Sequence, residues 1–249
     1  ADASLFRIGS ITKLFTWVSV MQLVQQGKLD LNADINTYLK DFKIPDTYPE
    51  PITLNNLMTH TPGFEDLVIG LFGKDSTTLK PLGEILKSQV PMRVRKPGTF
   101  ASYSNHGTAM AAYIVEQVSG MPFNDYVEKN IIGPLGMTHT TLRQPLPTAF
   151  KPNMSKGYKY VEGIFSEQPF EYVPLYPAGS ASTTAMDMVP FMRMFLENGK
   201  LNGAVVLDSA TLALMKTPAH QHDPAVNPMR HGLIDMSRGG VEVIGHGGD

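Results

Sequence analysis

The chain has 249 residues, of which 42% are hydrophobic and 18% charged, the balance of an ordinary globular protein. A net charge of −2 provides no electrostatic footprint for nucleic acid or for an anionic membrane. Cysteine is absent, which excludes disulfides, thiolate metal sites and a cysteine nucleophile.

The first half of the chain predicts helices separated by turns and a proline-rich loop. Residues 10–26 place apolar side chains at helical spacing, and Gly27 is suited to end that helix. Thr53 is a candidate N-cap for a short helix over residues 54–59, which a turn at 60–63 follows. Three further helices are predicted, with residues 97–105 as a loop before the second of them: 79–89, 108–119 and 122–132.

The second half mixes short strands with helices. Strands are predicted over residues 157–161 and 170–173, and again over 232–236 and 241–245 with a turn between the last two. Thr183 or Thr184 caps a predicted helix over residues 185–197, and Ser209 caps a shorter one that reaches Lys216. Helices dominate the middle of the chain, and strands lie near its end.

A serine and a lysine three residues apart stand at the start of the first predicted helix. On a helix this spacing places Ser10 and Lys13 on one face. A serine hydroxyl becomes a nucleophile when a base takes its proton, and a lysine is such a base only if its pKa is lowered. The alternative is a serine N-cap followed by a solvent-exposed lysine.

Two further motifs occur once each. Tyr103 can relay protons beside a lysine, and Asn105 offers a donor and an acceptor that can grip an amide or ester; the alternative is a buried tyrosine and a turn asparagine. His246, Gly247 and Gly248 follow an apolar strand, where the glycines let a ligand lie against the strand edge. The backbone N–H groups of Ser10 and Asp249 would then form an oxyanion hole, the alternative being a plain glycine turn.

Other candidate sites are weaker. His220 and His222 resemble a metal-ligand pair, but their polar, proline-flanked segment is typical of a surface loop, so no metal site is predicted. Neither a Gly-x-Ser-x-Gly elbow nor a glycine-rich phosphate loop occurs, and no cofactor is expected. The longest apolar stretch, residues 14–24, is too short to span a bilayer.

Taken together, these motifs resemble the serine β-lactamase and penicillin-binding-protein superfamily, in its class C, D-Ala-D-Ala carboxypeptidase and esterase branch. The resemblance extends along the chain through these segments: FRIGSITK (6–13), LMTHTPG (57–63), Pro97-Gly98 through Tyr103-Ser104-Asn105, VSGMPF (118–123), PLGM (134–137) and AGS (178–180). It implies Ser10 as acylated nucleophile, Lys13 and Tyr103 as its proton-transfer partners, and Asn105 with His246, Gly247 and Gly248 as substrate-binding residues. Many relatives have lysine where His246 stands, and a histidine, largely neutral near pH 7, weakens a claim specific to β-lactams.

The resemblance implies an α+β, β-lactamase/transpeptidase-like fold: an antiparallel sheet flanked by helices, with a mostly helical lobe. We expect one domain over residues 1–249, in which residues 27–180 form the helical lobe and residues 1–26 and 181–249 belong to the α/β lobe. Family members have further strands on both sides, so we also expect that the chain is truncated at both ends. It starts at Ala1 with no signal-peptide pattern.

The implied function is a serine hydrolase that cleaves an ester, amide or β-lactam through an acyl-enzyme on Ser10. Two alternatives stay open. One is a class C β-lactamase or a D-Ala-D-Ala carboxypeptidase specifically, and the other is a penicillin-binding or inactive module without turnover. A small-molecule or peptide substrate is the expected partner. The resemblance favours a periplasmic, secreted or membrane-tethered location, while the compartment and the oligomeric state stay open.

Overall fold

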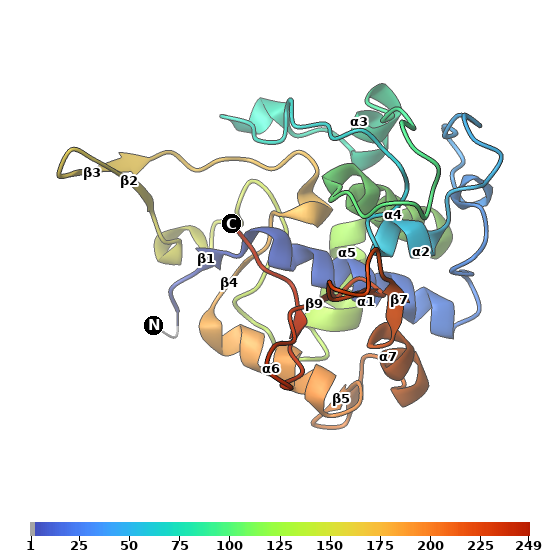
Figure 1. Ribbon diagram of the computed structural model, residues 1–249. Coiled ribbons are helices and arrows are strands. Elements are labelled where there is room, and N and C mark those ends of the chain that lie inside the picture. The colour runs from blue at the N-terminus through green and yellow to red at the C-terminus, as the bar shows by residue number, and fades with distance from the viewer. Residues whose placement is uncertain (1–2) are drawn as a thin grey trace.

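The computed structural model describes residues 3–249, and one long buried helix organises it (Figure 1). Helix α1, Lys13–Gln25, is buried on nearly every side from Lys13 to Leu23. Several of its polar side chains make internal hydrogen bonds; the Thr16 hydroxyl, for example, donates to the Pro177 carbonyl at 3.0 Å. A helix that is surrounded by protein needs such partners, because an unpaired buried polar group is costly.

Several other helices pack on α1, and α2 and α3 pack on α4. Helix α4 lies against α1, and the C-terminal helix α7 and the short α5 contact α1 as well. The α-helices are α2 Leu54–Met58, α3 Leu82–Ser88, α4 Asn105–Ser119, α5 Phe123–Val127, α6 Ala185–Leu196 and α7 Ser209–Met215. Single turns of other helix types cover Gly9–Thr12, Ile35–Thr37, Ser76–Thr78, Glu128–Ile132, Lys151–Asn153 and Tyr176–Ala178.

The strands are short and antiparallel. β1 (Phe6–Arg7) pairs with β4 (Ser182–Thr183), and β5 (Lys200–Leu201) pairs with β6 (Ala204–Val205). Four strands near the end of the chain form a sheet in the order β10-β9-β8-β7: β7 Pro218–His220, β8 Met229–Arg230, β9 Ile234–Asp235 and β10 Ile244–Gly245. The pairing of β1 with β4 joins the segment before α1 to the segment before α6.

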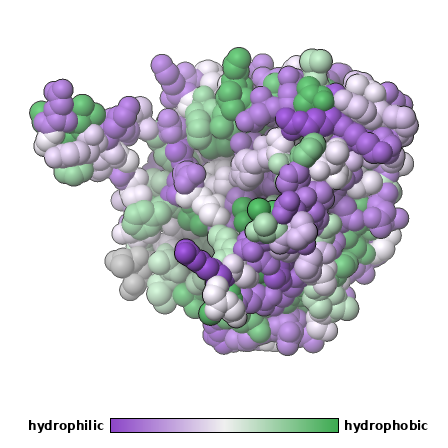
Figure 2. All heavy atoms as spheres, viewed as in Figure 1, coloured by the Kyte–Doolittle hydropathy of each residue, from purple (hydrophilic) through white to green (hydrophobic). Residues whose placement is uncertain are grey.

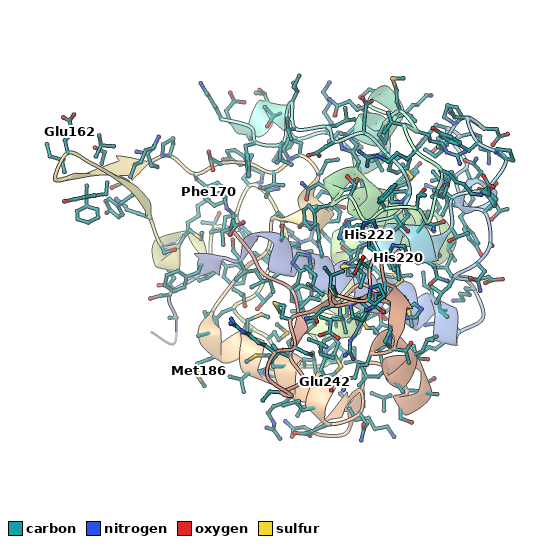
Figure 3. All side chains as sticks on the ribbon, viewed as in Figure 1. Glu162, Phe170, Met186, His220, His222 and Glu242 are labelled. Atoms are coloured by element: carbon teal, nitrogen blue, oxygen red, sulfur yellow. The ribbon has the colours of Figure 1, made fainter. Side chains whose placement is uncertain are left out.

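A hairpin of β2 (Gly157–Val161) and β3 (Ile164–Gln168) stands clear of the body, with Glu162 at its tip (Figures 1, 2 and 3). All ten of its strand residues are exposed. The prediction of a strand over 157–161 is confirmed, whereas the strand predicted over 170–173 is wrong. Residues 170–173 lie instead in an extended segment, where Tyr172 exchanges two backbone hydrogen bonds with Gly73.

Helix boundaries follow the predicted caps in most places. Gly27 adopts a left-handed φ of +67° and donates to the Val24 carbonyl, which ends α1 as expected. Thr53 forms a reciprocal capping box with Asn56, and Thr184, not Thr183, caps α6. Asp208 caps α7 in place of the predicted Ser209, since its carboxylate reaches the Thr211 N–H at 2.6 Å.

Four other helix predictions need correction. The helix predicted over 10–26 is an α-helix only from Lys13, because Gly9–Thr12 forms a tighter turn. The helix predicted over 108–119 is α4, which begins earlier, at Asn105, with Ser104 as its N-cap; the predicted loop over 97–105 was therefore wrong to include Asn105. The helix predicted over 122–132 changes after Val127 into a π-turn, and the one over 79–89 is confined to α3.

In the described part of the chain no helix is long and apolar enough to cross a membrane. The division into a helical lobe and an α/β lobe stays a prediction.

Candidate active site

Ser10 is placed by the tight turn that precedes α1. Gly9 has a left-handed φ of +49°, and the Thr12 hydroxyl donates to its carbonyl at 2.6 Å. The same hydroxyl accepts from the Ala181 N–H at 3.0 Å, while the Ile8 N–H donates to the Ala181 carbonyl at 3.0 Å. These bonds hold the serine turn against the segment that leads into β4.

Two polar side chains converge on the Ser10 hydroxyl from different elements. The Lys13 Nζ lies 3.0 Å from Ser10 Oγ, one turn further along the chain. The Tyr103 hydroxyl donates to the same oxygen at 2.7 Å, from the residue just before the N-cap of α4. Residues that are 93 positions apart in sequence therefore meet at one oxygen atom.

Lys13 is completely buried, and its ammonium group has two further acceptors. Its Nζ donates to Asn105 Oδ1 and to the Ala178 carbonyl oxygen, both at 2.7 Å. Burial lowers the pKa of Lys13 to about 7, because a charged amine loses its hydration in the interior. The alternative interpretation of Lys13 as a solvent-exposed lysine is therefore wrong.

Tyr103 is less buried than Lys13, with 42% of its surface exposed. Desolvation raises the pKa of its phenol, the hydrogen bond to Ser10 opposes that shift, and the negative charge of Asp249 adds to it. The Lys13 Nζ lies 4.7 Å from the centre of the tyrosine ring. The phenol is therefore protonated near neutral pH, which makes it a proton donor.

Asn105 reaches the site because α4 begins there. The Ser104 hydroxyl accepts from the Gly107 N–H at 3.0 Å, which is the N-cap bond that starts the helix. Its neighbour Asn105 then turns its carbonyl oxygen toward Lys13. The interpretation of Asn105 as a turn residue is wrong, since it is the first residue of a helix.

The His246–Asp249 segment lies against the backbone of Ile8 and Gly9, just before Ser10. A β-carbon on Gly248 would overlap the Ile8 carbonyl oxygen, and one on Gly9 would lie 2.8 Å from the Asp249 nitrogen, whereas Gly247 has open space around it. The His246 ring lies 5.9 Å from that of Tyr103. Burial lowers the pKa of His246, its hydrogen bond with Gly247 opposes this, and the charge of Lys13 adds to it.

Sequence reasoning missed three groups that shape the site. The Ala178 carbonyl binds Lys13, the Thr12 hydroxyl links the serine turn to Ala181, and His60 packs against Tyr103 with ring centres 4.6 Å apart. The AGS and LMTHTPG segments were singled out by resemblance only, and a backbone carbonyl carries no signal in the side-chain pattern. Of the three groups, only the Thr12 hydroxyl could have been noticed in the sequence, because Thr12 lies at the third position of the Ser-x-x-Lys motif.

The two histidines of the weaker metal candidate lie together near the middle of the view (Figure 3). His222 packs its ring 4.8 Å from Phe100, and His220 Nε2 is buried with no hydrogen-bond partner. Burial, and then the neighbouring His222, lower the pKa of His220. Between residues 3 and 249, no three histidine, aspartate or glutamate side chains gather in a way that could hold a metal ion.

Comparison with known proteins identifies the family. A sequence model of the family described as Beta-lactamase matches residues 2–249. The chain belongs to the beta-lactamase family. Among curated relatives, this beta-lactamase-family chain is 32% identical over 205 residues to the putative penicillin-binding protein PbpX of Bacillus subtilis strain 168, covering 79% of the chain and 47% of the relative. It is 28% identical over 220 residues to penicillin-binding protein 4 of Amycolatopsis lactamdurans, covering 86% and 56%.

Solved structures show the fold. The octameric penicillin-binding protein homologue from Pyrococcus abyssi superposes with a TM-score of 0.82 at 25% identity, over 99% of this chain and 57% of that one. The D-amino acid amidase from Ochrobactrum anthropi SV3, in complex with L-phenylalanine amide, superposes with a TM-score of 0.79 at 26% identity, over 100% and 71%. The predicted α+β, β-lactamase/transpeptidase-like fold is confirmed. The chain spans about half the length of the two curated relatives.

Proposed function

We propose that the chain is a serine hydrolase that cleaves an amide, ester or β-lactam through an acyl-enzyme on Ser10. The observation that carries this proposal is the convergence of Lys13 Nζ and the Tyr103 hydroxyl on Ser10 Oγ, at 3.0 and 2.7 Å. One group has a pKa lowered to about 7 and the other a raised pKa, so a base and an acid flank the nucleophile.

The two other partners of Lys13 support its role as the base. The Ala178 carbonyl oxygen and Asn105 Oδ1 can only accept hydrogen bonds. A neutral lysine has two N–H donors and one lone pair, so when both donors serve these acceptors the lone pair faces Ser10 Oγ. Tyr103 donates its phenol proton to Ser10 Oγ, so the serine's own proton can point at the lone pair of the amine. The hydrogen-bond directions then run from Tyr103 through Ser10 to Lys13.

In the proposed acylation step, Ser10 Oγ bonds to the substrate carbonyl carbon and its proton passes to Lys13 Nζ. The bond to the leaving group breaks as Tyr103 gives its proton to the departing nitrogen or oxygen. The lysine then returns a proton to the tyrosine oxygen, so that both groups recover their starting states. In the second half, water attacks the acyl carbon and its proton passes to Lys13 Nζ. The bond from that carbon to Ser10 Oγ breaks as Tyr103 gives its proton to the serine oxygen, and the lysine again returns a proton to the tyrosine oxygen.

Charge on the carbonyl oxygen would be stabilised by the backbone N–H groups of Ser10 and Asp249, which we propose as the oxyanion hole. The close approach of Gly9 and Gly248 to the neighbouring backbone supports this, because a side chain at either position would push the two segments apart. Asn105, His246 and Gly247 would line the substrate on the two sides of Ser10. No step in this scheme requires a cofactor.

The names of the similar proteins support amide substrates, because these proteins include penicillin-binding proteins and a D-amino acid amidase. A class C β-lactamase or D-Ala-D-Ala carboxypeptidase is a narrower alternative. His246 weakens the β-lactamase alternative, since burial lowers the pKa of this histidine and the site then has no permanent cation there for a substrate carboxylate. A penicillin-binding module that is acylated without turnover is the remaining alternative.

A substrate panel tests the proposal. A chromogenic cephalosporin, a D-Ala-D-Ala peptide, a D-amino acid amide and p-nitrophenyl acetate are compared on the wild type and on Ser10→Ala. We expect turnover of the amide and the ester that Ser10→Ala abolishes. Equal rates in both proteins would exclude the mechanism. A lasting penicillin adduct on Ser10 without turnover of any compound would favour the binding module.

A further inference from the structure

His60 occupies a backbone conformation that favours glycine. It follows α2 with a left-handed φ of +55°, the position at which a helix most often ends in glycine. A side chain there is strained unless its interactions compensate, and the imidazole is buried, with 3% of its surface exposed. The contacts of the imidazole compensate for this backbone strain.

The hydrogen bonds of His60 hold the backbone on both sides of Tyr103. Its carbonyl oxygen accepts from the Ser102 N–H at 2.7 Å, and its ring Nδ1 accepts from the Ser104 N–H at 3.1 Å. The imidazole also packs against the tyrosine ring, with 4.6 Å between ring centres, and the Trp17 ring meets it edge-on at 6.4 Å. One residue therefore fixes the segment that carries the tyrosine and supports the tyrosine ring itself.

The imidazole is neutral near pH 7. Burial, then the charge of Lys13 and then that of His246, lower the pKa of His60 to about 3. A neutral ring that accepts at Nδ1 carries its proton on Nε2, so Nδ1 stays available to the Ser104 N–H. A charged ring would lose this acceptor and place a second cation beside Lys13.

We propose that His60 is a positioning residue for Tyr103, which acts through the acceptor Nδ1 to keep the phenol on the Ser10 hydroxyl. The inference rests on the proposed function, because it concerns the tyrosine of the same acyl-transfer site. It assigns His60 no proton transfer of its own: the residue contacts Tyr103 and its backbone neighbours, and Tyr103 contacts Ser10.

Two substitutions separate the acceptor from the backbone strain. Asparagine tolerates the left-handed region, and its Oδ1 occupies the position of Nδ1, so His60→Asn keeps the acceptor and loses the ring. His60→Gly relieves the strain and loses both. Asn198 is an exposed residue with a φ of +56°, so Asn198→Gly is a matched control for relief of strain away from the site.

Hydrolysis of p-nitrophenyl acetate is measured for these proteins and for Ser10→Ala, as kcat and KM, with thermal melts of each. We expect that kcat falls about tenfold in His60→Gly, the effect of one buried N–H left without its acceptor, while KM changes little. The melting temperature of His60→Gly should fall, because a buried ring is removed, so kcat is compared at a temperature where every protein is folded. His60→Asn should recover kcat to within about threefold of the wild type, and Asn198→Gly should match the wild type.

Each failure has its own signature. If the wild type is no faster than Ser10→Ala, the proposed function and this inference fall together. If the wild type depends on Ser10 and His60→Gly keeps its kcat, the inference alone is overturned. It is equally overturned if His60→Asn is as slow as His60→Gly, because the acceptor would then not be what positions the tyrosine.

Discussion

Placing a carboxylate beside the lysine amine tests the proposed base most sharply. Asn105 Oδ1 lies 2.7 Å from Lys13 Nζ, so Asn105→Asp puts a negative charge at that distance with little change in shape. An opposite charge this close favours the protonated lysine and raises its pKa by about one to three. The substitution therefore opposes the burial that lowers the pKa of Lys13 to about 7.

The size of the effect follows from the fraction of neutral lysine. With a pKa of about 7, about half of the Lys13 amines are neutral at pH 7. A pKa raised by about two leaves about 1% neutral, so the acylation rate at pH 7 falls roughly fiftyfold and recovers as the pH approaches 9. The wild-type rate should instead rise through pH 7 and level off above it.

The assay is the second-order rate constant for p-nitrophenyl acetate hydrolysis between pH 5.5 and 10, corrected for Ser10→Ala. The midpoint of the rise is the diagnostic quantity, because loss of the asparagine amide can lower the plateau through weaker substrate binding. Asn202→Asp adds the same charge at an exposed turn and should leave the midpoint unchanged. An unchanged midpoint in Asn105→Asp would refute Lys13 as the base.

Three further outcomes are expected. Because the folded-state pKa of Lys13 is lowered from 10.5 to about 7, the unfolded chain binds more protons between those values, and wild-type stability relative to Lys13→Met should rise by about 1.4 kcal/mol per pH unit there, as measured by urea unfolding. The pKa of His60, lowered from 6.5 to about 3, should make the wild type lose stability relative to His60→Asn as the pH falls below 6.5, seen in thermal melts. Gly248→Ala should impair Ser10 acylation by penicillin or ester, because its β-carbon meets the Ile8 carbonyl, while Gly157→Ala, in the exposed hairpin with only a 3.9 Å contact to Gln168, should not.

Much of the fold could be predicted because local rules decided it. The apolar spacing and Gly27 located α1, and the Thr53 and Thr184 caps located α2 and α6. The strand error at 170–173 has a physical origin: aromatic composition alone does not specify a partner, and the hairpin pairs β2 with the adjacent β3 instead. The start of α4 was missed because Ser104 is at once part of a catalytic-looking motif and an N-cap.

Some contacts of the site could likewise be predicted from the sequence, and others could not. Side chains at helical spacing, such as Ser10 and Lys13, can be paired from the sequence. The meeting of Tyr103 with Ser10 depends on the packing of α4 on α1, which no local pattern specifies. The Ala178 carbonyl and the support that His60 gives to Tyr103 were beyond prediction, since one is backbone and the other depends on a left-handed residue far away in sequence.

Mass spectrometry of the protein trapped with substrate tests the central claim most directly. The wild type is mixed with p-nitrophenyl acetate or benzylpenicillin, quenched in acid within the first turnover, digested and sequenced. We expect one acyl adduct, on the Ser10 hydroxyl. It should be absent in Ser10→Ala, and it should form more slowly in Lys13→Met and Tyr103→Phe. An adduct on another residue, or hydrolysis that continues in Ser10→Ala, would contradict the central claim.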